Sequence, residues 1–161
     1  MNYRYNDEVE EIKHVLSLYG LYQRKEQQFL QEAMELEMEI DDMMDIQGIN
    51  FEEKIGGSRN PKETPAIHQK QHELVYADKK ANEYREKYEF LDEVYQIEEK
   101  LIKLPKQQRV LIELALFKKV SYDKIAMLNA KDGYIITRQS MGERVRNALN
   151  SFIKIKVQTD E

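Results

Sequence analysis

A row of polar and charged side chains near the C-terminus has the residue types that read base edges in DNA. The row consists of Arg138, Gln139, Gly142, Glu143 and Arg146. Residues three or four positions apart share one face of a helix, so a helix beginning at residue 138 would present them together. In the major groove, arginine pairs with guanine, glutamine pairs with adenine, and glutamate accepts from the cytosine amino group. Glycine lets the backbone approach closely. The row therefore predicts base reading by the start of one helix.

Residues around this row have the chemistry to hold phosphates. Lysine and arginine neutralise phosphates, and hydroxyl groups and helix N-termini also contact them. The candidates for contact with the DNA backbone are Lys118, Lys119, Ser121, Lys124, Lys131, Thr137 and Arg144.

The charge of the chain reverses near residue 101. Residues 101–161 hold 12 Lys+Arg against 6 Asp+Glu, a net charge of +6, whereas residues 1–100 hold 13 against 24, a net charge of −11. A basic segment joined to an acidic one is typical of a small nucleic-acid-binding module attached to a segment that pairs with protein.

Other kinds of chemistry find little support in the residues. The chain has no Cys, which excludes disulfides, thiolate metal sites and thiol nucleophiles. His68 and His72 have the i, i+4 spacing of a helical metal pair, but no third ligand is evident, so we expect no metal. The sequence Gly56-Gly57-Ser58 lacks the Gly-Lys-Ser/Thr ending of a phosphate-binding loop. We therefore expect no catalytic residues, no enzyme activity and no cofactor.

Three short helices are expected to position the polar row. Pro105 is suited to the first position of a helix, and Lys118-Lys119-Val120 ends that helix. Its expected inner face is Val110, Leu111, Leu114 and Phe117.

Serine and threonine begin the other two short helices. Ser121 is a good N-cap for a second helix of about nine residues, with Asp123 in its first turn. Its apolar stripe is Ile125, Ala126 and Leu128. Thr137 caps the third helix, whose inward positions are Met141, Val145, Ala148, Leu149 and Phe152. Three helices at this spacing predict a helix-turn-helix.

Two long apolar seams precede these helices, each with a period of about 3.5 residues. The first is Val9, Ile12, Leu16, Tyr19, Tyr22, Phe29, Ala33, Leu36, Ile40 and Met43, with a gap near Glu26. The second is Ile67, Leu74, Ala77, Ala81, Tyr84, Tyr88, Leu91 and Tyr95, and continues to Leu101 or Ile102. A narrow apolar stripe on a long helix does not stay unpaired in water, so the seams pair with each other or with a second subunit.

The predicted fold is therefore all-α. A long antiparallel, coiled-coil-like hairpin occupies residues 1–103, with a connecting loop at 47–65, and a basic helix-turn-helix domain occupies residues 104–161.

The basic segment resembles the fourth region of bacterial sigma factors, a helix-turn-helix that grips a promoter element. The resemblance covers Leu104 to Leu149 and is carried by LPKQQRVLIEL, VSYDKIAML and ITRQSMGERVRNAL. The eight residues from Asn129 to Ile136 are more than sigma-like modules usually have between these two helices. Lys131-Asp132-Gly133-Tyr134 therefore looks like an insertion in the turn.

The order of long helix, Gly-Gly loop, long helix and sigma-like module is similar to a group of late-gene transcription activators. These are the RinA and ArpU-like proteins of phages and prophages of Gram-positive bacteria. The resemblance implies a sequence-specific DNA-binding transcription regulator that activates phage late genes. Its implied partners are double-stranded promoter or operator DNA, further copies of the chain through the hairpin, and host RNA polymerase.

Two alternatives stay open. One is a phage DNA-packaging factor resembling terminase small subunits, although those usually place the DNA-binding part first. The other is a sigma-like module that binds RNA polymerase or a repressor without touching DNA. The chain has no apolar run of about 18 residues and its N-terminus is polar, so we expect no membrane span, no secretory signal and a cytoplasmic location in a bacterial host cell.

Overall fold

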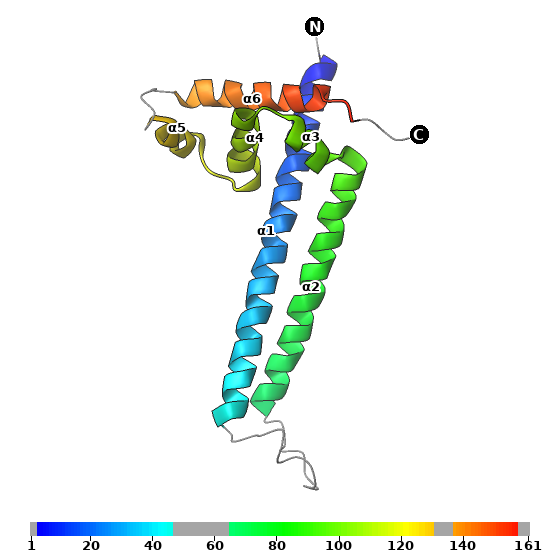
Figure 1. The fold of residues 1–161 in the computed structure, drawn as a ribbon, viewed down its shortest axis with the longest axis vertical. Helices are drawn as coiled ribbons and strands as arrows, with labels where there is room; N and C mark the ends of the chain where they lie inside the picture. Colours follow the sequence, from blue (N-terminus) through cyan, green and yellow to red (C-terminus); the bar gives the residue numbers. More distant parts are fainter. Residues whose placement is uncertain (1–2, 47–64, 131–136, 158–161) are drawn as a thin grey trace. The chain divides into compact units, whose positions relative to one another are not determined.

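Helices make up most of the part of the chain that the structure describes. The computed structural model describes residues 3–46, 65–130 and 137–157, and no strand occurs in these ranges. The elements are α1 (Tyr3–Ile46), α2 (Pro65–Tyr95), α3 (Ile97–Lys103), α4 (Lys106–Ile112), the π-helical turn η2 (Glu113–Phe117), α5 (Tyr122–Ala130) and α6 (Arg138–Lys154) (Figure 1). Two long helices followed by short ones confirm the predicted all-α fold, a helical hairpin and then a helical domain. Within the described ranges, no helix has the length and apolar character needed to cross a membrane.

Packing divides the chain into two compact units. The hairpin unit is Arg24–Arg85, and the terminal unit combines Met1–Gln23 with Glu86–Glu161. The start of α1 therefore belongs to the same unit as the short C-terminal helices. The predicted division between residues 103 and 104 follows charge, whereas these units follow the packing of apolar side chains.

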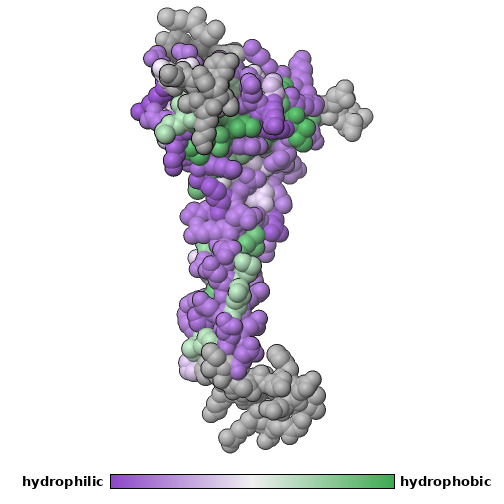
Figure 2. Space-filling model, turned by 60° about the vertical axis from the view of Figure 1, so that its left-hand side comes forward, coloured by the Kyte–Doolittle hydropathy of each residue, from purple (hydrophilic) through white to green (hydrophobic). Residues whose placement is uncertain are grey.

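In the hairpin unit, α1 and α2 run antiparallel. Their buried residues are Ala33, Leu36 and Ile40 from α1 and Ile67, Ala77 and Ala81 from α2. The ring of Phe29 stacks on that of Tyr84, with 5.9 Å between their centroids. These residues belong to the two predicted seams, so the seams do pair with each other here. The molecular face drawn in Figure 2 is mainly hydrophilic, with apolar residues confined to small patches.

An ion pair with a buried carboxylate fills the gap in the first seam. Glu26 is only 4% exposed and lies in line with the buried apolar residues of α1. Its Oε2 atom accepts a hydrogen bond from Nε of Arg85 on α2 at 2.5 Å. A carboxylate is expensive to bury without a partner, so the guanidinium offsets the loss of water around Glu26. The pair also fixes the register of the two helices at this level.

The terminal unit has one continuous apolar core to which every helix in it contributes. Leu16 of α1, Ile97 of α3, Ile112 of α4, Ile125 of α5 and Phe152 of α6 are each at most 1% exposed. Removing the first 20 or so residues of α1 would expose this core to water, which makes α1 part of the C-terminal domain in structural terms.

The second long helix ends earlier than the seam predicts. We expected it to continue to Leu101 or Ile102, but Gln96 has φ 54° and ψ 45°, and α3 starts afresh at Ile97. Left-handed backbone is unfavourable for a residue with a Cβ. Two contacts favour the break: Ile97 and Leu101 are buried in the terminal core, and the Asp92 carboxylate accepts from the Glu98 amide at 2.8 Å.

Tyr19 ties α1 to the start of α3. Its ring is 2% exposed and contacts the rings of Tyr88 and Phe117, at centroid distances of 5.8 Å and 5.4 Å. Its hydroxyl donates a hydrogen bond to the Glu98 carboxylate. Burial, followed by the hydrogen bond to Glu98, raises the pKa of Tyr19 above its ordinary value, so the phenol stays protonated.

The inner face of α4 and η2 also differs from the prediction. Val110 is 38% exposed, and Leu111, Leu114 and Phe117 are only partly buried, whereas Ile112, Ala115 and Leu116 are the buried residues. Other helices pack against this segment on more than one side. A single apolar face predicted from the sequence therefore does not identify all of its buried residues. Pro105 precedes the helix, which begins at Lys106.

The end of η2 is set by a left-handed residue. Lys119 has φ 54°, and the amides of Lys118 and Val120 donate to the carbonyls of Glu113 and Leu114 at 2.9 Å and 2.8 Å. This is the pattern that closes a helix and satisfies its last carbonyl groups. It confirms the predicted helix end at Lys118-Lys119-Val120.

Candidate nucleic-acid interface

Two side-chain caps fix the helices that carry the predicted contact residues. The Ser121 hydroxyl accepts from the Lys124 amide at 3.3 Å, and the Thr137 hydroxyl accepts from the Ser140 amide at 3.1 Å. Both predicted caps are confirmed, and α5 has the predicted nine residues. Each hydroxyl oxygen accepts the capping hydrogen bond, and the hydroxyl hydrogen remains available to donate to a phosphate.

The inner face of α6 is the one the sequence predicts. Met141, Val145, Ala148, Leu149 and Phe152 are each at most 2% exposed. Burial of the whole stripe sets the rotation of the helix about its own axis. The polar residues of α6 are therefore held in a defined direction relative to the terminal core.

The apolar stripe of α5 was predicted less well. Ile125 is 1% exposed, as expected, but Leu128 is 50% exposed and neighbouring Met127 is 70% exposed. Leu128 was predicted to be buried, and that prediction is wrong. Ile125 holds α5 in the terminal core together with Tyr122 and Ala126, which are partly buried against it.

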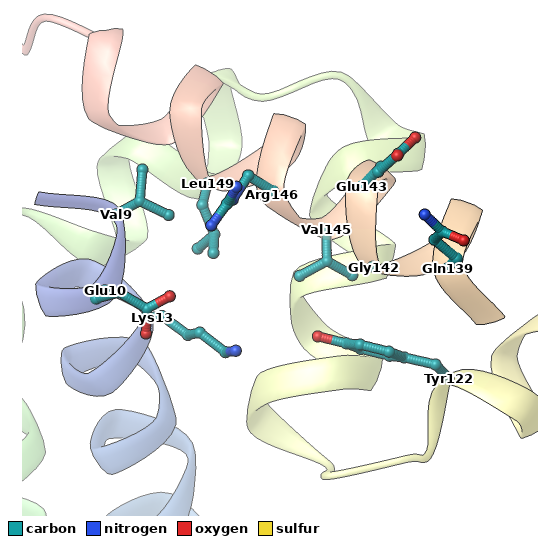
Figure 3. Close-up of a pocket in the computed structure, with 10 residues that line it drawn as sticks. All are labelled: Val9, Glu10, Lys13, Tyr122, Gln139, Gly142, Glu143, Val145, Arg146 and Leu149. Carbon is teal, nitrogen blue, oxygen red and sulfur yellow. The ribbon is translucent and has the colours of Figure 1, made fainter. Parts of the chain in front are cut away.

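Four of the five predicted base-reading residues line one cleft of about 380 Å³. Gln139, Gly142, Glu143 and Arg146 form its α6 wall, together with the edges of Val145 and Leu149 (Figure 3). Arg138, at the first position of α6, does not line the cleft. Arg138, Gln139, Glu143 and Arg146 are exposed, Gly142 is half-buried, and Val145 and Leu149 are buried.

The other walls of the cleft come from distant parts of the sequence. Val9, Glu10 and Lys13 belong to α1, and Tyr122 belongs to α5. Figure 3 shows Lys13 extending from α1 toward Tyr122, below Val145 and Gly142 of α6. Sequence reasoning missed these residues because nothing local links positions 9–13 to α6. The one sequence feature that pointed to a packed position here was the apolar spacing of the first seam, which includes Val9.

The charges of the cleft nearly cancel. Lys13 and Arg146 are basic, whereas Glu10 and Glu143 are acidic. Such a cleft has hydrogen-bonding groups of both kinds but little net attraction for phosphate. Its chemistry suits the donor and acceptor pattern of base edges better than a polyanion.

Cations outside the cleft are better suited to phosphate. Lys118, Lys119, Lys124 and Arg144 are exposed. In the part of the chain that the structure describes, no carboxylate forms an ion pair with any of these four. Lys131, the remaining predicted backbone contact, lies outside the described residues.

Gly142 lies next to the Tyr122 ring. A Cβ at this position would lie 3.7 Å from Cε2 of Tyr122, an ordinary van der Waals contact. The packing of α6 beside Tyr122 therefore does not require a glycine at this position.

No cluster of three or more metal ligands accompanies this interface in the described ranges. Groups of three or more His, Cys, Asp or Glu side chains able to hold a metal ion are absent from them. The Gly56-Gly57-Ser58 sequence lies outside the described residues.

No family model, curated protein or solved structure matches this chain.

Proposed function

We propose that this protein is a sequence-specific DNA-binding transcription regulator and that α6 is its recognition helix. One observation carries the proposal: α6 is capped at Thr137, its apolar stripe is buried, and its outer face holds exposed Gln139, Glu143 and Arg146 in one row. A helix held by its inner face, with donors and acceptors on its outer face, has the requirements for major-groove reading.

Each residue of the proposed interface has a distinct role. Arg138 and Arg146 donate to guanine, Gln139 pairs with adenine, and Glu143 accepts from cytosine. Lys118, Lys119, Lys124 and Arg144 contact phosphates and set the orientation of the duplex without reading sequence. The acidic residues of the cleft repel phosphate, so they favour orientations in which the sugar–phosphate strands lie nearer these exposed cations.

Self-association completes the proposal. One helix-turn-helix makes few base contacts, so regulators of this size bind DNA as dimers or larger oligomers. The hairpin is the proposed oligomerisation element. Contact with host RNA polymerase and activation of phage late genes are proposed from the resemblance to sigma factors and to the phage activators.

A protein-only role is the second candidate. It is favoured by exposed Met127 and Leu128 on α5, because neighbouring exposed apolar side chains suit a protein contact better than a phosphate contact. In that role the sigma-like domain would bind RNA polymerase or a repressor. The packaging-factor alternative would bind DNA without a promoter site.

Binding-site selection with the full-length chain tests these functions. A fragment starting near residue 101 is unsuitable because it lacks Leu16 and Tyr19 of the terminal core. Arg138→Ala and Gln139→Ala should each relax the preference at one base pair and cost about 1–3 kcal/mol on the best site. Lys118→Ala should weaken all sequences alike and reduce the salt slope by about 1.

The matched control is Lys79→Ala, which removes an exposed cation from α2 in the hairpin unit and should leave both properties unchanged. Absence of DNA binding at low salt would reject the proposal and favour the protein-only role. A sequence preference that changes with Lys118→Ala but not with Arg138→Ala and Gln139→Ala would place the recognition surface elsewhere.

A further inference from the structure

We propose that His68 and His72 chelate one divalent cation of the kind that favours imidazole, namely Cu²⁺, Ni²⁺ or Zn²⁺. Both side chains are exposed and lie one turn apart on α2. Their Nε2 atoms are 3.2 Å apart, and their rings are nearly perpendicular, at 88°, with centroids separated by 4.7 Å. The site belongs to the hairpin unit and is independent of the proposed DNA interface.

The distance between the two nitrogens suits adjacent positions around a metal ion. With zinc–imidazole bonds of about 2.0–2.1 Å, nitrogens that subtend a right angle are about 2.9 Å apart, and those at a tetrahedral angle are about 3.3 Å apart. The observed 3.2 Å lies between these values. In the structure this contact is a hydrogen bond between the two rings, so chelation replaces the shared hydrogen and the rings rotate until both Nε2 atoms face the ion. The spacing of the nitrogens needs no change in the helix.

A third protein ligand is not required for such a site. The sequence prediction rejected a metal because no third ligand was evident, and none joins the pair among the residues that the structure describes. Two imidazoles on adjacent helical turns nevertheless act together, because binding to one raises the effective concentration of the other. Water fills the remaining positions, so the site is an open one.

The ligand type determines which ions bind. Imidazole nitrogen suits copper, nickel and zinc, whereas magnesium and calcium prefer oxygen ligands. The affinity should be highest for Cu²⁺, following the general order for divalent ions of this row. A bound ion links two successive turns close to the beginning of α2 at Pro65, so it stabilises that end of the helix.

Calorimetric titration of the full-length chain with each metal alone tests the proposal. We expect one Cu²⁺, Ni²⁺ or Zn²⁺ ion per chain and no measurable binding of Mg²⁺. His68→Gln and His72→Gln should each lower the affinity by a factor on the order of 10², because each leaves a single imidazole. His14→Gln, which removes the third histidine, on α1, should leave the affinity unchanged.

A spacing variant separates chelation from binding by any exposed histidine. His72→Gln combined with Glu73→His keeps three imidazoles but places two of them five positions apart, on different sides of the helix. This variant should bind like His72→Gln, with helix content by circular dichroism equal to that of the original chain.

NMR provides the second measurement. During a Zn²⁺ titration, the imidazole signals of His68 and His72 should shift together while those of His14 stay in place. Equal metal affinity in the original chain and the spacing variant would overturn the proposal, as would unchanged affinity in His68→Gln or His72→Gln.

Discussion

Gly20 allows η2 to lie directly against α1, and an alanine at this position tests that packing. A Cβ there would be 2.4 Å from Cα of Phe117 and 3.0 Å from both its Cβ and its carbonyl oxygen. The nearest obstacle is backbone, which cannot rotate away as the end of a side chain can. Gly20→Ala therefore forces α1 and η2 apart in the middle of the terminal core.

The size of the effect follows from two opposing contributions. Overpacking a core costs about 1–3 kcal/mol, and a clash with backbone belongs near the upper end. Alanine is the better helix former and regains about 1 kcal/mol. We expect a net loss of about 2 kcal/mol, equivalent to a fall in Tm of about 4–8 °C for a chain of this size.

Thermal and urea unfolding followed by circular dichroism measure this loss. Gly142→Ala is the matched control, because it also replaces a helical glycine but its new Cβ would meet nothing closer than 3.7 Å. It should gain about 0.5–1 kcal/mol from helix propensity. A Gly20→Ala variant as stable as the original chain would refute the close packing of η2 on α1.

Substitutions at three further contacts are tested by urea unfolding. Arg85→Met removes the guanidinium from buried Glu26 and should lower the free energy of unfolding by about 2 kcal/mol, which is less than for a fully buried pair because Arg85 is half exposed. Glu26→Leu removes the buried carboxylate itself and should leave the free energy of unfolding nearly unchanged. A larger loss for Glu26→Leu than for Arg85→Met would contradict this reasoning. The raised pKa of Tyr19 means that the folded chain keeps a proton that the unfolded chain, with the ordinary value of 10.0, releases. The protonated phenol of Tyr19 therefore contributes its full stabilisation below pH 10, and this contribution falls as the pH rises above 10. With Tyr19→Phe, the free energy of unfolding should decrease less steeply above pH 10. The same pH dependence in both chains would contradict the raised pKa. Thr137→Ala should lower the free energy of unfolding by about 1 kcal/mol because the α6 cap is lost. Thr137→Ser keeps the capping hydroxyl and should retain most of that free energy. Equal losses in the two variants would exclude capping as the cause.

The predictions that were confirmed depend on chemistry within a few residues. Thr137 caps α6 because its hydroxyl reaches the amide three residues later, and no distant part of the chain is needed for that bond. The buried stripe of α6 follows from the spacing of its apolar residues along 17 residues of helix. Such patterns constrain the structure strongly because every turn repeats the same information.

The predictions that failed depend on contacts between distant residues. The apolar spacing continues through Gln96, but the helix does not, because Ile97 and Leu101 are buried in a core that includes α1. By helix propensity alone Gly20 is an unfavourable residue within a long helix, whereas its lack of a Cβ is what admits Phe117. Neither fact can be derived from the neighbours of the residue in sequence.

The charge reversal near residue 101 was informative about surface chemistry and misleading about packing. Acidic residues dominate the first 100 positions, yet Val9 and Leu16 from that part share a core with basic α6. Apolar side chains decide which helices pack, and the charges follow on the outside. As a consequence, Glu10 and Lys13 of the acidic part stand beside Gln139 and Arg146. If α6 reads DNA, the first helix therefore supplies both a support for the recognition helix and one carboxylate and one ammonium group at an edge of the reading surface.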